Sequence, residues 1–220
     1  SRIMKKLVAL FPATMLALGG VAMTPSAVFA QAAPAASTAK EELVKISKVN
    51  VGVQKTPKIV ADGPTDKRWK PKDWLEIEVD CEAKLSKKAT DKKQTTYPEV
   101  TFKYYVYLEG QSTDKSRILT GEVAHTNVPI GEPIHSVMYV TPSTILNLTG
   151  KPEGNASAVK FWGVEVLIGG EEVGRKTSQA DKPWWEAPKA PAKEAGLKNK
   201  METPFAILWG DYHLDVRGGR

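Results

Sequence analysis

Apolar and polar residues alternate over most of the chain between residues 41 and 178. The longest such segment is 100–108, where Val, Phe, Tyr, Val and Leu occupy every second position. A period of two places alternate side chains on opposite faces of a strand, so the pattern predicts β-strands with one buried face. Seven segments have this pattern: 49–53, 75–82, 100–108, 117–126, 134–140, 159–168 and 171–178.

The connections between these segments carry turn and helix signals. Gly169 and Gly170 separate the last two segments, and glycine adopts the positive φ angles that tight hairpin turns require. Between the fifth and sixth segments, Thr141 precedes Pro142 and a short apolar run that Gly150 closes. Thr before Pro is typical of a helix start. The sequence therefore predicts a hairpin at the glycine pair and one short helix.

Seven short antiparallel strands at this spacing are typical of an immunoglobulin sandwich. We expect an all-β fold, an immunoglobulin-like antiparallel β-sandwich over residues 41–186, with one short helix and an extra strand at the C-terminus. Cys81 is the only cysteine, so the chain lacks the disulfide of antibody domains. Because Cys81 is in register with apolar positions of its strand, a buried, inert thiol is favoured over an intermolecular disulfide.

The first thirty residues have the features of a signal peptide. Lys5 and Lys6 precede an apolar run over residues 7–18 that is too short to span a membrane, and Val28-Phe29-Ala30 resembles a cleavage site. We expect residues 1–30 to be removed before Gln31 and residues 31–40, rich in Ala, Pro, Ser and Thr, to form a spacer. This predicts the periplasm, outer membrane or cell surface of a Gram-negative bacterium, with membrane contact only through the uncleaved leader.

The charge of the chain gives no reason to expect a nucleic-acid partner. The formal net charge is +6, and the leader holds Arg2, Lys5 and Lys6 and no acidic residue, which leaves +3 on the remainder. A basic balance this small, mixed with many acidic residues, does not form the field that attracts nucleic acid.

Acidic residues recur at every second position of the second predicted strand, at Glu76, Glu78, Asp80 and Glu82. Such a stripe is the nearest approach to a calcium site in the sequence. However, residues two apart on a strand lie about 6.5 Å apart and diverge, whereas calcium sites wrap the ion with loops. We therefore interpret the stripe as a solvated outer face opposite lysines such as Lys103.

The remaining chemistry-bearing residues form no catalytic pattern. His125, His135 and His213 are scattered along the chain, and none has the spacing of paired zinc ligands. No Gly-x-Ser-x-Gly elbow and no glycine-rich phosphate loop occurs in the sequence. The sequence thus predicts a protein that is not an enzyme, with no catalytic residue, no metal ligand and no cofactor.

Two tryptophan pairs offer a different kind of contact. Trp184 and Trp185, together with Trp69 and Trp74, have the flat apolar surface on which sugar rings stack, which makes a glycan-binding module the alternative function. The simpler interpretation is that one ring of each pair closes an end of the sandwich, because buried aromatic rings dominate small cores.

The C-terminal region differs from the rest of the chain. Residues 187–203 are expected to be a linker, and residues 204–220 a docking strand that is as apolar as a core strand. Left in water, its large apolar groups would cost about 1.5 to 3 kcal/mol each. We expect it to fold back on its own sandwich near Trp184 and Trp185, or to be donated to a second copy or another partner. The residues that would dock are Phe205, Ile207, Trp209, Tyr212 and Leu214.

Taken together, the chain resembles the type IV pilus-associated, immunoglobulin-like envelope proteins of mucin-dwelling gut bacteria. The resemblance is based on the leader, the Ala/Pro spacer, the strand 161–168 with its Gly169-Gly170 turn, and the C-terminal tail. It implies an immunoglobulin-like fold related to the globular parts of archaeal pilus subunits, with envelope or pilus proteins as partners. No prepilin helix follows the leader, which argues against a polymerising subunit, and the resemblance supplies no catalytic or binding residue.

Overall fold

The computed structural model describes residues 41–58, 69–152, 154–179 and 182–218. The chain divides into two compact units, Ser1–Thr38 and Ala39–Arg220, and all described residues belong to the second. The expected signal peptide and spacer lie outside the described residues. Among the residues described, no helix has the length and apolar character needed to cross a membrane.

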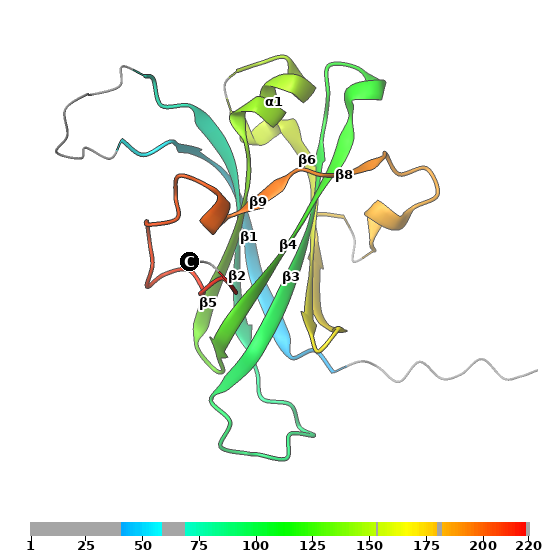
Figure 1. Ribbon diagram of the computed structural model, residues 1–220. Helices are drawn as coiled ribbons and strands as arrows, with labels where there is room; N and C mark the ends of the chain where they lie inside the picture. Colours follow the sequence, from blue (N-terminus) through cyan, green and yellow to red (C-terminus); the bar gives the residue numbers. More distant parts are fainter. Residues whose placement is uncertain (1–40, 59–68, 153, 180–181, 219–220) are drawn as a thin grey trace, which may run out of the picture. The chain divides into compact units, whose positions relative to one another are not determined.

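The second unit is built of two β-sheets, which confirms the all-β prediction (Figure 1). The four-stranded sheet has the order β1-β2-β5-β9, and the five-stranded sheet has the order β7-β6-β3-β4-β8. Their bounds are β1 Val44–Lys55, β2 Asp73–Ala83, β3 Thr96–Leu108, β4 Arg117–Pro129, β5 Pro133–Val140, β6 Val159–Ile168, β7 Glu171–Thr177, β8 Lys193–Ala195 and β9 Leu197–Asn199.

The strand order is that of an immunoglobulin-like sandwich. β1, β2 and β5 form one sheet and β4, β3, β6 and β7 the other, all with antiparallel neighbours. In immunoglobulin nomenclature these are strands A-B-E and C′-C-F-G. All seven strands predicted from the alternation are therefore present, and they are arranged as the fold class requires.

The core lies between the sheets and is filled by the alternate apolar residues that the sequence pattern marked. In β3 the buried positions are Val100, Phe102, Tyr104, Val106 and Leu108. On the inward side of β2, Cys81 is buried, and burial raises the pKa of its thiol to about 12. The predicted burial of the thiol is confirmed, and the raised pKa disfavours the thiolate, which is the reactive form of a cysteine.

The predicted turn and helix are also confirmed. Gly169 and Gly170 have φ angles of 59° and 84° between β6 and β7. The helix α1 spans Pro142–Thr149; the Thr141 hydroxyl accepts from the backbone N–H of Thr144 at 3.1 Å, and Gly150 ends the helix at a φ of 70°. These residues match the backbone angles and caps that each position requires.

The extra strands at the C-terminal end of the chain are formed by residues other than those expected. The segment 187–203, predicted as a linker, contains β8, which pairs in parallel with β4, and β9, which pairs antiparallel with β5. The predicted docking strand over 204–220 is wrong in its secondary structure. Over its described residues, 204–218, it forms successive turns and only two isolated bridges, at His213 and Val216. The reason is that β9 already occupies the edge of β5, and Pro204 lacks the N–H that a ladder needs.

Candidate functional site on the docked C-terminal tail

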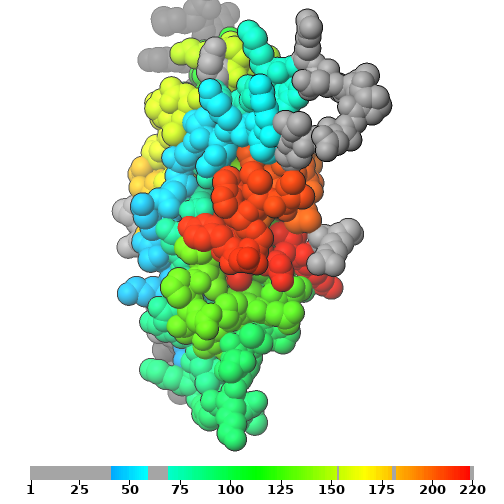
Figure 2. Space-filling model, turned by 90° about the vertical axis from the view of Figure 1, so that its left-hand side faces the viewer, coloured from blue at the N-terminus to red at the C-terminus, as the bar shows by residue number. Residues whose placement is uncertain are grey.

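The tail, which we define as residues 200–218, covers part of the outer face of the four-stranded sheet. It begins with a single 3-10 turn, Lys200–Glu202, whose capping box is formed by Asn199 and Glu202. Figure 2 shows the tail, in orange and red, as a surface patch on this face of the protein. The tail is thus docked on its own sandwich in this structure, the first of the two arrangements expected from the sequence.

Phe205 anchors the tail. Its ring is buried, stacks on Tyr139 of β5 at 4.7 Å and meets Trp74 of β2 edge-on at 5.7 Å. With Val137 these rings form a small apolar cluster on the outer face of the sheet, separate from the main core. β5 is therefore buried on both faces. The uninterrupted apolar run over residues 137–140 is the sequence signal for this, because strands buried on both faces lose their alternation.

The end of the tail joins both sheets through backbone hydrogen bonds. The N–H of Leu214 donates to the carbonyl of His135 on β5 at 3.0 Å. The N–H of Thr126 on β4 donates to the carbonyl of Asp215 at 3.1 Å, and the N–H of Arg217 donates to Ala124 at 2.8 Å. Because β4 and β5 belong to different sheets, this segment bridges the two layers at one side of the sandwich.

A buried polar chain runs from the core to the tail through His125. The carbonyl of Asp215 can only accept a hydrogen bond, so Nδ1 of His125 donates to it at 3.2 Å. Nε2 then accepts from the Ser136 hydroxyl at 2.7 Å, and Ser136 in turn accepts from the Tyr104 hydroxyl at 2.8 Å. Burial lowers the pKa of His125 to about 4, so the imidazole is neutral at pH 7.

Two carboxylates and two imidazoles meet where the tail crosses the four-stranded sheet. Nδ1 of His135 lies 2.8 Å from Oδ1 of Asp80, and Nε2 of His213 lies 3.1 Å from Oε2 of Glu78. We call these four residues the histidine–carboxylate cluster. His135 and His213 are far apart in the sequence but close together in the structure, so the interpretation of them as scattered was wrong. The β2–β5 register and the bridge between His135 and the tail bring them together.

The acidic stripe on β2 is also not the free solvated face that the sequence suggested. Glu76, Glu78 and Asp80 are half-buried, and only Glu82 is exposed. Lys103 lies in the other sheet and pairs with Glu122 at 3.9 Å. The expectation that the strand of Lys103 lies beside the acidic strand was wrong. Sequence alternation shows which residues share a face, but it does not show which strands are adjacent.

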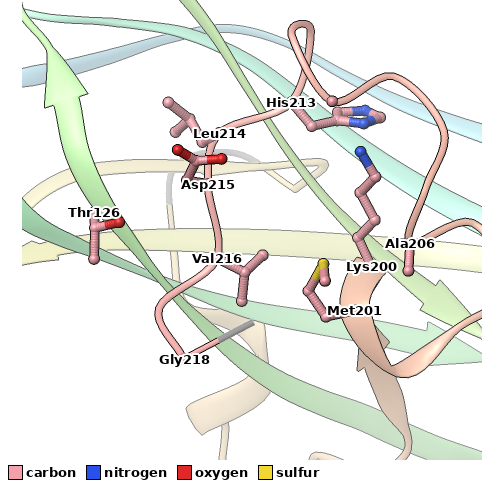
Figure 3. Close-up of a pocket in the computed structure, with 10 residues that line it drawn as sticks. Thr126, Lys200, Met201, Ala206, His213, Leu214, Asp215, Val216 and Gly218 are labelled. Atoms are coloured by element: carbon pink, nitrogen blue, oxygen red, sulfur yellow. The ribbon is translucent and has the colours of Figure 1, made fainter. Parts of the chain in front are cut away.

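Beside His213, the tail and Thr126 of β4 line an open pocket of about 490 Å³ (Figure 3). Lys200 and His213 line it and are both buried. The Lys200 ammonium donates to the carbonyl of Trp209 at 3.1 Å, and burial lowers its pKa. Burial likewise lowers the pKa of His213, against the opposing effect of Glu78. With Nε2 directed at Glu78, Nδ1 of His213 has no hydrogen-bond partner among the described residues.

The tail also carries an exposed apolar surface. Ile207 is 70% exposed, and Trp209, Tyr212 and Met201 are exposed as well. Three of the five expected docking residues thus face solvent in this structure, while Phe205 is buried and Leu214 is packed against the core. We call Met201, Ile207, Trp209 and Tyr212 the apolar tail surface.

The tryptophans of the alternative glycan site lie elsewhere. Trp185 is 1% exposed and stacks on Tyr105 of the five-stranded sheet at 4.3 Å, while Trp184 is half-buried. A buried ring cannot stack on a sugar, so Trp185 is a packing residue on the outer face of the five-stranded sheet. The tail docks on Trp74 and Tyr139 of the other sheet, so the expected docking near Trp184 and Trp185 is wrong.

These features define an immunoglobulin-like β-sandwich whose C-terminal tail is fastened across one sheet. A protein-family model matches residues 35–220, and the chain belongs to that family. The chain is also similar to a protein from Akkermansia muciniphila whose crystal structure is known. The two are 27% identical with a TM-score of 0.71, over 79% of this chain and 92% of that chain. No curated protein matches this chain. The similarity agrees with the expected likeness to proteins of mucin-dwelling gut bacteria.

Proposed function

We propose that this is a non-enzymatic structural or interaction protein of the bacterial cell envelope, associated with type IV pilus assembly or with display at the outer membrane. The fold supports a binding role, since the immunoglobulin-like sandwich presents surfaces and loops on a rigid scaffold. Fold alone does not define function, so the proposal depends on the tail.

The observation that supports the proposal most directly is the apolar tail surface. Four large apolar side chains gather on one short docked segment, and Ile207 is 70% exposed. Large exposed apolar groups are typical of protein contact sites, and aromatic residues are enriched at the centres of such contacts. Because Phe205 and the backbone bonds hold the segment in place, the surface is presented without a large ordering cost on binding.

Site-specific crosslinking in the native bacterium tests this proposal. A photoreactive residue at Ile207 should capture a pilus or other envelope protein. The same residue at Leu146, which is exposed on α1 outside the tail, should not capture it. Capture of cytoplasmic proteins alone from position 207, or equal capture from both positions, would contradict the proposed role of the tail.

Export is the second part of the proposal, and it has its own test. The basic start, the apolar run and the small residues before Gln31 predict cleavage by signal peptidase. Protein recovered from the envelope fraction should begin at Gln31 by intact mass. Recovery of the uncleaved chain from the cytoplasm would contradict both the export and the envelope role.

A further inference from the structure

The histidine–carboxylate cluster has the composition of a transition-metal site. It contains two imidazole nitrogens and two carboxylate groups, on Glu78, Asp80, His135 and His213. Imidazole and carboxylate together suit Zn²⁺ and its neighbours, whereas Ca²⁺ and Mg²⁺ take oxygen ligands. Four such ligands are also the usual number for a closed zinc site.

The backbone fixes where these side chains originate. Asp80 of β2 is the direct ladder partner of His135 of β5, and His135 is bridged to His213 of the tail. Glu78 precedes Asp80 by two residues and so lies on the same face of β2. The donors therefore come from three adjacent backbone segments held by hydrogen bonds, including the one from Leu214 to His135.

Three of the four donor groups lie close enough together to fit one ion after a small movement, and the fourth, on His213, adjoins Glu78. Donor atoms of Glu78, Asp80 and His135 all lie within 4.8 Å of one another, and Nε2 of His213 is 3.1 Å from Glu78. Tetrahedral ligands at zinc lie about 3.3 Å apart, given metal–ligand bonds of about 2.0 to 2.2 Å. Among Glu78, Asp80 and His135, side-chain rotation that closes the widest separation by about 1.5 Å would meet this geometry. Nε2 of His213, which lies outside this group of three, would also have to turn from Glu78 towards the ion.

The charge of the cluster favours a divalent cation. Among the residues that the structure describes, the only ion-pair partners of Glu78 and Asp80 are the two histidines, which are charged only when protonated. With neutral imidazoles the cluster carries two negative charges in a half-buried place, and a divalent ion would balance both.

The surroundings provide both shielding and access. The His213 side chain is 3% exposed, and the ring of Tyr212 stacks on His135 at 3.9 Å. The Tyr212 hydroxyl donates to the other oxygen of Glu78 at 3.4 Å, the kind of outer contact that orients a ligating carboxylate. A cavity of about 370 Å³ reaches Glu78 and His213 from the surface.

We propose that Glu78, Asp80, His135 and His213 bind one Zn²⁺-type ion, which fastens the tail to the outer face of β2 and β5. Three ligands belong to the sandwich and one to the tail, so metal binding and tail docking reinforce each other. An ion that binds only the folded, docked form stabilises that form by mass action. The proposal goes beyond the envelope role and does not depend on it.

Calorimetric titration of the full chain, prepared without a histidine tag and stripped with EDTA, tests the site. We expect one Zn²⁺ per chain and a melting temperature that rises with Zn²⁺. Ca²⁺ at the same concentration should have no such effect. Co²⁺ should give the visible absorption of a tetrahedral site.

The ligand variants His135→Gln and His213→Gln should each weaken Zn²⁺ binding by at least about tenfold. Asp80→Asn keeps the β2–β5 pairing and serves as the third variant if His213→Gln releases the tail. Glu82→Gln, on the same face of β2 but exposed, should bind Zn²⁺ as the parent does. The proposal is wrong if the folded parent binds no Zn²⁺, if Ca²⁺ binds equally well, or if these three variants bind like Glu82→Gln.

Discussion

At the scale of single residues, His125 makes the stability of the fold depend on pH. Its imidazole is neutral in the folded protein because burial lowers its pKa to about 4, whereas the unfolded chain has an ordinary pKa of about 6.5. Below pH 6.5 the unfolded state therefore binds a proton that the folded state does not. Stability falls as the pH drops from 6.5 towards 4, by about 3 kcal/mol in total, and is unaffected by this group above pH 6.5.

The prediction is checked by urea unfolding across this pH range. The parent should lose stability faster than His125→Gln, which has no titrating group at this position. The difference between the two curves isolates His125 from the carboxylates that titrate in the same range. Parallel curves for parent and variant would show that His125 is not held neutral in the folded protein.

Gly163 is a second single residue on which packing depends, because it leaves room for the ring of Trp185. A Cβ at this position of β6 would collide with the ring of Trp185, whereas a Cβ on Gly52 of β1 would meet nothing within 4 Å. We expect Gly163→Ala to destabilise the protein by about 1 to 3 kcal/mol through overpacking. The matched change Gly52→Ala should stay within about 0.5 kcal/mol of the parent.

Chemical denaturation followed by tryptophan fluorescence measures both variants. The emission of Trp185 should also change in Gly163→Ala, because its stacking on Tyr105 is disturbed. Equal stability of the two variants would mean that Trp185 is not packed over β6, and would reopen its use as a glycan contact.

At the scale of elements, the tail offers a matched pair of substitutions. Phe205 is buried between Tyr139 and Trp74, while Ile207, two residues on, is 70% exposed. Phe205→Ala should cost about 3 to 5 kcal/mol, the range for a buried aromatic ring. Ile207→Ala should cost no more than about 0.5 kcal/mol.

Thermal unfolding of both variants shows whether the tail is packed on the sandwich or only tethered to it. If the tail were only tethered, the two substitutions would have similar, small effects. A large effect of Ile207→Ala without one of Phe205→Ala would reverse the assignment of the buried face.

The elements also show what the sequence could and could not predict. Alternation located seven strands, since period two follows directly from one-sided burial. It missed the first residues of β1, where a register shift between Ile46 and Lys48 interrupts the pattern. In the tail the same alternation was misleading, because Phe205, Ile207 and Trp209 lie in consecutive turns, with Trp209 at a φ of 53°.

The histidine–carboxylate cluster could not be predicted from the sequence, for a related reason. Its residues are far apart in the chain and meet only because β2 pairs with β5 and the tail returns along β5. Residue spacing reports on neighbours within one strand or helix, whereas long-range pairing depends on the whole topology. The loss of alternation in β5 was the one local signal that something covers its outer face.

At the scale of the whole molecule, the tail completes the sandwich. It covers Val137 and Tyr139 on the outer face and links β4 to β5 at the side. Removing residues 196–220 would take away β9, Phe205 and this link together. We expect the truncated chain to be strongly destabilised and to self-associate through the uncovered face and the free edge of β5.

Sedimentation velocity and denaturation of this truncated chain measure both effects. A truncated chain that remains monomeric and as stable as the parent would show that the tail is dispensable to the sandwich. A truncated chain that is stable but has lost self-association present in the parent would instead indicate donation of the tail to a second copy.

The central claim is that each chain docks its own tail, and hydrogen exchange of the tail amides at two protein concentrations tests it most directly. The amides of Leu214 and Arg217 donate to His135 and Ala124 of the sandwich. We predict that both are protected to the same extent at low and at high concentration, since the bonds form within one chain. Exchange as fast as in an unstructured peptide, or protection that appears only at high concentration, would contradict docking within one chain.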